Sequence, residues 1–72
     1  MDDRDDLVKA QQQIIGILFE IIKLQQANSD LDSEYFKIVT GSDVMQSRLD
    51  EIIKMKQSNS ETIARLLEQL ET

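Results

Sequence analysis

The sequence predicts an all-α protein, a helical hairpin with coiled-coil-like heptads that assembles into a homo-oligomeric helical bundle. Three observations predict it: apolar residues recur every three or four positions, the chain contains no proline, and its apolar face is wide. A chain of 72 residues without cysteine has no disulfide to support a small core, so self-association or very regular helix packing must stabilise it.

The apolar residues follow a seven-residue repeat along most of the chain. When Leu7 is placed at position a, positions a and d up to Leu70 comprise 19 residues, of which 15 are apolar. The four exceptions are Asn28, Ser42, Lys56 and Asn59. Outside these positions, and leaving out Met1, only 13 of 52 residues are apolar. A strand would alternate with period two, so this pattern indicates helix and favours left-handed, coiled-coil-like packing.

The elements follow from local signals along the repeat. We expect one helical module over residues 1–72, with a first helix at about 3–40, a turn at about 41–42 and a second helix at about 43–71. Gly41 can adopt the left-handed conformation that often ends a helix, and Ser42 or Asp43 can cap the next one. Weaker capping signals at 28–30 and 58–61 leave the heptad spacing uninterrupted. If Gly41 did not break the helix, the chain would form one coiled-coil helix about 100 Å long.

The width of the apolar face indicates how the helices assemble. Position e carries Leu18, Val39, Ile53 and Leu67, where a two-stranded zipper would carry charges. Such a seam of a, d and e residues is typical of bundles with three or more helices. The predicted oligomer or partner interface consists of Leu7, Ile14, Ile15, Ile17, Leu18, Phe19, Ile21, Ile22, Leu24, Leu49, Ile52, Ile53, Ile63, Leu66, Leu67 and Leu70.

The first half of the first helix has an apolar arc of roughly 200°, because apolar residues continue onto positions b and f. One antiparallel neighbour cannot cover such an arc. We interpret it as the core of a homo-oligomer; the alternatives are a docking groove for another protein's helix and insertion at a membrane surface. The acidic residues of the polar face, such as Glu20, disfavour the membrane.

Lys56 at position a and Asn59 at position d interrupt the seam of the second helix. Polar residues at such sites can set the register or the oligomeric order at some cost in stability. Alternatively, the seam is simply exposed at these two residues. The sequence leaves both interpretations open.

Composition disfavours catalysis and bound cofactors. The chain has no histidine and no cysteine, so it lacks a base that titrates near neutral pH and a thiol nucleophile. Asp30, Asp32 and Glu34 have the spacing that begins a calcium loop, but Tyr35 and Gly41 stand where that loop needs glycine and glutamate. We therefore expect no enzyme, no cofactor and no metal site.

The expected function is a non-enzymatic protein–protein interaction module, a small oligomeric adaptor, assembly or regulatory protein. With 14 acidic and 8 basic residues the net charge is −6, which disfavours nucleic acid. The alternative, a helical-hairpin regulator associated with nucleic acid, would rely on Arg48, Lys54 and Lys56. The apolar stretch at 14–24 is too short for a membrane span and the acidic start does not resemble a signal peptide, so we expect a soluble, cytoplasmic protein.

Overall fold

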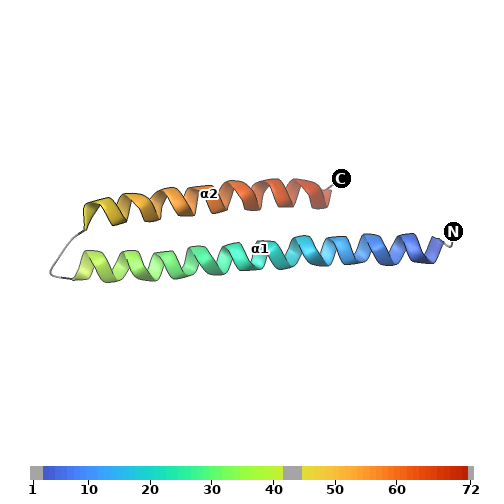
Figure 1. The fold of residues 1–72 in the computed structure, drawn as a ribbon, viewed down its shortest axis with the longest axis horizontal. Coiled ribbons are helices and arrows are strands. Elements are labelled where there is room, and N and C mark those ends of the chain that lie inside the picture. Colours follow the sequence, from blue (N-terminus) through green and yellow to red (C-terminus); the bar gives the residue numbers. More distant parts are fainter. Residues whose placement is uncertain (1–2, 42–44, 72) are drawn as a thin grey trace.

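The computed structural model describes residues 3–41 and 45–71, which form two helices packed as a hairpin. Helix α1 (Asp3–Thr40) and helix α2 (Gln46–Glu71) run side by side in opposite directions (Figure 1). The prediction of an all-helical hairpin is confirmed. The single long helix is wrong, because the longest dimension of the molecule is 63 Å and not the roughly 100 Å of a continuous rod.

Helix α1 ends at the predicted glycine, but by a different geometry. The Gly41 N–H donates to the Ile38 carbonyl at 3.2 Å, which closes a tight final turn, and the Thr40 hydroxyl donates to the Phe36 carbonyl at 2.7 Å. No described glycine has a positive φ. The left-handed closure expected at Gly41 is therefore wrong.

Helix α2 begins at Gln46, three residues later than the expected Asp43. The Met45 carbonyl accepts the first hydrogen bond of the helix, from the Leu49 N–H at 3.1 Å. Met45 thus takes the N-cap position although its side chain has no oxygen with which to cap. Ser42 and Asp43, the expected capping residues, lie outside the described residues. The chain is helical through 28–30 and 58–61.

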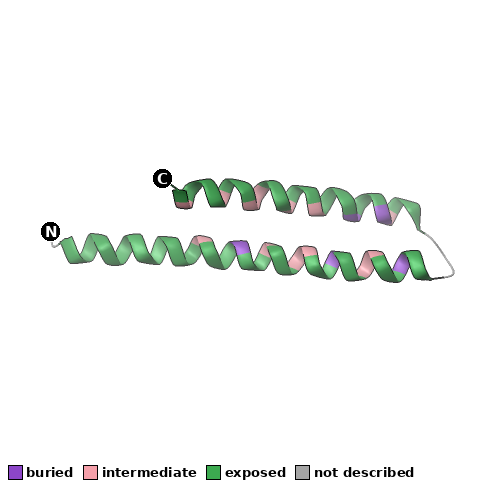
Figure 2. Ribbon diagram, turned by 180° about the vertical axis from the view of Figure 1, so that it is seen from behind, coloured by how far each residue is buried: buried purple, intermediate pink, exposed green. Residues whose placement is uncertain are grey.

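The buried core lies between the two helices, mostly near the turn (Figure 2). The buried residues are Ile21, Leu31, Ile38, Leu49 and Ile52. All five occupy positions a or d, and all but Ile21 form one cluster against which Tyr35 packs. The hairpin therefore uses the a and d positions to join α1 to α2.

The two helices differ in length, with 38 residues in α1 and 26 in α2. As a result the N-terminal part of α1 extends past the last turn of α2 (Figure 1). Every described residue before Ile17 is exposed. We call residues 3–16 the overhang.

Gly16 offers a direct test of this helical overhang. A Cβ built on Gly16 meets no atom within 4 Å. Because alanine is a better helix former in open space, Gly16→Ala should stabilise the helix by about 0.5–1 kcal/mol. Far-UV circular dichroism during a thermal melt should show greater helicity and a higher melting temperature.

Gly41→Ala is the matched comparison. A Cβ there would lie 3.1 Å from the Lys37 carbonyl oxygen, and this crowding offsets the entropy that alanine removes from the unfolded chain. We expect a smaller gain than at Gly16, or a small loss. Destabilisation of both variants by more than about 1 kcal/mol would contradict the described backbone at these positions.

Candidate protein-interaction surface

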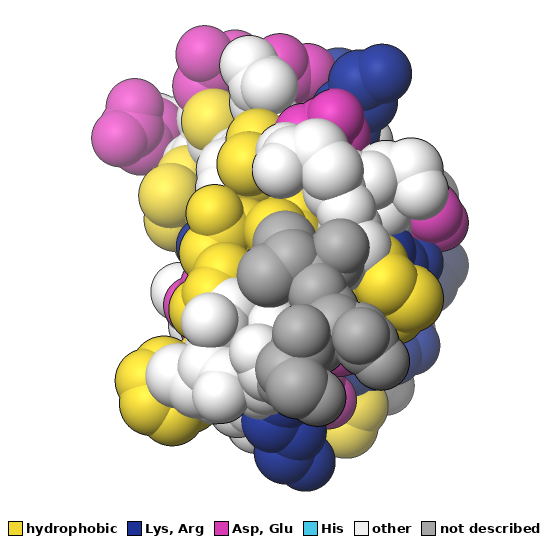
Figure 3. Space-filling model, turned by 90° about the vertical axis from the view of Figure 1, so that its left-hand side faces the viewer, with side chains coloured by type: hydrophobic (Ala, Val, Ile, Leu, Met, Phe, Trp, Pro, Cys, Tyr) yellow, Lys and Arg dark blue, Asp and Glu magenta, His cyan; other side chains and the backbone are white. Residues whose placement is uncertain are grey.

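The structure divides the sixteen predicted interface residues into two equal sets. Eight are buried or half-buried in the hairpin seam: Ile17, Ile21, Leu24, Leu49, Ile52, Ile63, Leu66 and Leu70. Eight remain exposed: Leu7, Ile14, Ile15, Leu18, Phe19, Ile22, Ile53 and Leu67. Figure 3, which looks onto the turn end, likewise shows hydrophobic side chains at the surface beside charged ones.

The hairpin covers a different flank of the seam from the one expected. Beside the a and d residues it half-buries four g residues, which are Ala27, Glu34, Arg48 and Thr62. The apolar e residues stay exposed, and these are Leu18, Val39, Ile53 and Leu67. Because each helix has a single neighbour, only one flank can be covered. These apolar e residues therefore remain outside the buried seam of the hairpin.

A group of exposed apolar residues lies on the side of α1 away from its seam. It consists of Val8, Ile15, Leu18, Phe19 and Ile22, and we call it the lateral patch. Phe19 is 65 % exposed, Ile15 62 % and Ile22 61 %. Exposed apolar patches of several hundred Å² on small proteins commonly mark interaction sites.

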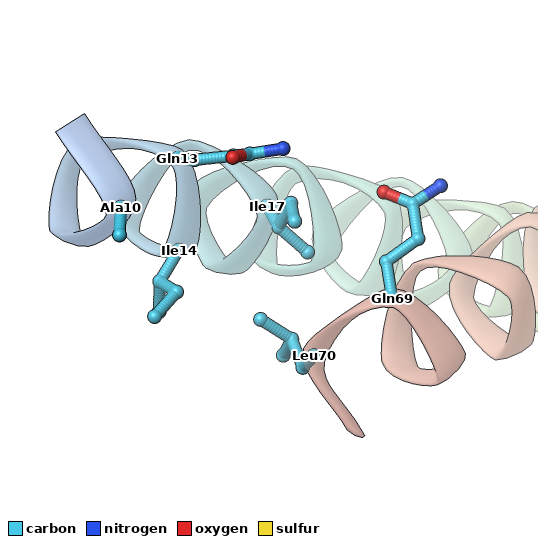
Figure 4. Close-up of a pocket in the computed structure, with 6 residues that line it drawn as sticks. All are labelled: Ala10, Gln13, Ile14, Ile17, Gln69 and Leu70. Atoms are coloured by element: carbon cyan, nitrogen blue, oxygen red, sulfur yellow. The ribbon is translucent and has the colours of Figure 1, made fainter. Parts of the chain in front are cut away.

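A groove lies where α2 ends against the overhang. Ala10, Ile14 and Ile17 of α1 and Leu70 of α2 form its apolar wall, with Gln13 and Gln69 also lining it (Figure 4). Its volume is about 400 Å³. This end groove is separate from the lateral patch, because it continues the seam itself.

A polar layer crosses the seam near its middle. The Asn59 side-chain amide donates to Asn28 Oδ1 at 3.0 Å, and the Asn28 amide donates to the Ser60 hydroxyl at 3.4 Å. One turn nearer the hairpin turn, the Lys56 ammonium pairs with the Asp32 carboxylate. Lys56 and Asn59 are half-buried and both contact α1. The structure thus places both register-setting candidates in specific contacts across the hairpin.

Arg48 ties the two helices together near the turn. Its Nη2 donates to Glu34 Oε1 at 2.8 Å while its Nε donates to Glu34 Oε2, which makes a two-point contact. Its Nη1 also pairs with Glu51 within α2 at 2.8 Å. The hydrogen bond from Arg48 holds the pKa of Glu34 below its ordinary value of 4.5, against a smaller opposing effect of desolvation. The same contact raises the pKa of Arg48.

Sequence reasoning missed the partners of these polar groups. Asn28 was recognised as an exception in the repeat and as part of a weak capping signal, although its a position faces the d position of Asn59 in an antiparallel pair. Glu34 and Arg48 both occupy position g, and in an antiparallel pair g residues meet g residues. The missing knowledge was the pairing register, without which these matches are not visible.

The described residues show few other chemical features. They contain no group of three metal-ligating side chains, and none of their helices is long and apolar enough to cross a lipid bilayer. Two of the three basic residues proposed for nucleic-acid contact, Arg48 and Lys56, are paired with carboxylates. The apolar surfaces are the features on which a proposal for function can be based.

The polar layer yields a prediction about register. The double change Asn28→Leu with Asn59→Leu should stabilise the hairpin by about 1–2 kcal/mol, because two half-buried amides become apolar. It should also permit shifted pairings of the two helices, because the variant lacks the polar layer that penalises them. Thermal melts measure the first effect, and extra sets of amide NMR signals reveal the second.

Ser29→Leu is the control, because it adds an apolar residue at an exposed helix position beside the layer. It should change neither stability nor the number of signals. Unchanged stability and a single set of signals in the double variant would show that the layer does not select the register.

The Glu34–Arg48 contact yields a prediction about pH. Because the pKa of Glu34 is lowered in the folded state, its stabilising contribution is complete above pH 4.5 and is lost as the pH falls through the lower, folded-state value. The melting temperature of the unaltered chain should fall between pH 6 and acidic pH. In Glu34→Gln this fall should be smaller, by a few degrees at most. Glu51→Gln, which removes only the contact within α2, should reduce it less. Equal effects would contradict the importance of the contact across the hairpin.

Comparison of the chain with protein-family models, with curated proteins and with solved structures finds no match. A proposal for function must therefore be built from the surfaces and contacts described above.

Proposed function

We propose that this protein is a non-enzymatic protein–protein interaction module that self-associates through the lateral patch of α1. A homo-oligomeric bundle of hairpins would then act as a small adaptor, assembly or regulatory protein. The observation that carries the proposal is the imbalance between buried and exposed apolar residues.

The single hairpin has a very small core. Five hydrophobic residues are buried, whereas thirteen large ones among the described residues are at least 42 % exposed. Burying a side chain of this kind contributes about 1.5–3 kcal/mol, while ordering each residue costs about 1–2 kcal/mol in backbone entropy. Association would bury apolar surface that one hairpin leaves in water. Folding and association are therefore expected to be coupled.

A second copy is a suitable partner for the lateral patch. The charges beside it on α1 include Glu20 and Lys23, which pair with each other at 3.6 Å, so they give the patch no excess of one sign. At about 200 Å² for a fully exposed large side chain, the patch offers roughly 500 Å² per copy. Two copies would bury about 1,000 Å², which is the lower limit for a specific interface. The exposed e residues could extend this contact to α2.

The nucleic-acid alternative has less support from the contacts. The carboxylates beside Arg48 and Lys56 neutralise two of its three basic residues. A phosphate backbone would have to displace Glu34, Glu51 and Asp32. We therefore retain protein association as the proposed function.

Self-association predicts a melting temperature that rises with protein concentration. Phe19→Asp should reduce the mass measured by light scattering to that of one chain and make the melt independent of concentration. The reason is that it places a charge in the shared apolar interface. In one isolated hairpin the same change is at an exposed position and should alter stability by no more than about 0.5 kcal/mol.

Two further variants complete the design. Phe36→Asp is the control, because Phe36 is exposed to the same degree, 66 %, but lies near the turn and outside the lateral patch. It should leave the mass unchanged. Ile17→Asp, in the seam, should damage the hairpin itself. A single-chain mass and a concentration-independent melt for the unaltered protein would refute the proposal.

A further inference from the structure

The lateral patch belongs to a second stripe along α1, formed by heptad positions b and e. From Arg4 to Val39 the members of this stripe follow one another at steps of three and four residues, and all of them are exposed. The stripe is exposed alongside α2 as well, since Ile22 is 61 % exposed where its neighbour Ile21 is buried in the seam. Steps of three and four are the spacing with which one helix receives another. The stripe can therefore pair with a further helix.

Only two residues of this stripe are charged, and they lie on either side of the lateral patch. Arg4 precedes the patch and Asp32 follows it, both at position e. Asp32 pairs with Lys56 of α2 but remains 60 % exposed. A helix that packs along the stripe meets both charges directly. They therefore restrict the orientation and register in which a second copy can pack.

Parallel packing of two copies brings like charges together. In a symmetric parallel pair each residue of the stripe faces its counterpart in the other copy. Arg4 would then face Arg4, and Asp32 would face Asp32, which is unfavourable at an interface. A staggered parallel contact is not symmetric and would propagate into an open filament. Neither parallel arrangement gives a closed pair without repulsion.

One antiparallel register avoids such contacts. In it, position b of one copy faces position e of the other, and Ile15 of each copy lies beside Leu18 of the other. The other facing pairs are Gln11 with Ile22, Val8 with Gln25 and Arg4 with Ser29. Asp32 lies past the first turn of α1 in the other copy. All four patch residues of the stripe are covered, and no charge faces an apolar or like-charged residue.

The other antiparallel registers, which differ by whole heptads, are less favourable. A shift toward the N-terminus places Arg4 opposite Ile22. Shifts the other way place Asp32 opposite Val8, Ile15 or Ile22 in turn, and each of these contacts buries a charge against an apolar side chain. A still larger shift leaves Ile15 beyond the end of α1 in the other copy. The charges thus select a single register.

We infer that two copies pack antiparallel along this stripe, with Ile15 of each copy beside Leu18 of the other. The inference rests on the proposed self-association through the lateral patch and specifies how the second copy lies. The two turns then point in opposite directions, and Phe36 of each copy lies outside the contact.

Substitutions at Ser29 test the register. Ser29 faces Arg4 of the other copy in the inferred pair, so Ser29→Glu should tighten association about five-fold at low salt and Ser29→Lys should weaken it about as much. Analytical ultracentrifugation measures both affinities. In a parallel pair Ser29 would face Ser29, and both variants would weaken association. Shifts in the same direction for the two variants would overturn the inference.

Ser58 provides the matched control. It is an exposed serine at position c of α2, away from the stripe. Ser58→Glu and Ser58→Lys measure the effect of net charge alone and should change the affinity less than two-fold. Effects at Ser58 as large as those at Ser29 would contradict a specific contact with Arg4.

A distance measurement tests the orientation independently. The chain contains no cysteine, so Lys37→Cys provides one spin-label site per copy at an exposed position near the turn. In the inferred pair the two labels should lie about 60 Å apart, at 1.5 Å per residue along the common axis. In a parallel pair they would lie within about 30 Å, since only the widths of two helices separate them. A distance below about 40 Å by pulsed electron paramagnetic resonance would overturn the inference.

These results separate the inference from the proposed self-association. A single-chain mass for the unaltered protein in light scattering would refute both. If the unaltered protein associates and Phe19→Asp dissociates it, but the labels at residue 37 lie close together, self-association stands and the antiparallel arrangement is wrong.

Discussion

The structure depends on one packing constraint: each helix has a single neighbour. An α-helix in contact with one other helix can bury a narrow stripe and one flank of its surface. Helix α1 carries a much wider apolar arc in its first half, with Ile15, Phe19 and Ile22 outside the stripe. The hairpin buries the stripe and leaves the rest of the apolar arc exposed. The surfaces proposed for binding follow from this limit.

Polar contacts across the hairpin accompany this alignment of the stripe. The hydrogen bond between Asn28 and Asn59 and the ion pairs Lys56–Asp32 and Arg48–Glu34 all join α1 to α2. The Asn28–Asn59 bond lies between the apolar cluster near the turn and the half-buried seam residues of the open end, whereas the Arg48–Glu34 pair lies beside the cluster. A shift of one heptad would separate these groups from their partners, and leaving partly buried polar groups unpaired has a free-energy cost. Apolar packing alone discriminates less between such registers.

The same alignment leaves two apolar surfaces of the hairpin exposed, the end groove and the lateral patch. Because α2 is shorter, the seam of α1 continues past its last turn. The lateral patch is flanked by the ion pair of Glu20 and Lys23, and we propose that it packs against an identical surface.

Much of the fold could be predicted from the sequence, because helix and turn signals are local. The heptad spacing predicted two long helices, Gly41 marked the break between them, and the buried Ile21, Leu31, Ile38, Leu49 and Ile52 all lie at predicted a and d positions. The sixteen candidate interface residues were all found in the same pattern, but it could not separate the seam residues from the exposed ones. Only the tertiary structure decided that division, the choice of the g flank, the pairing of Asn28 with Asn59 and the length of the overhang. These features depend on the rotation and register of one helix against the other, which are set by contacts between residues far apart in the chain.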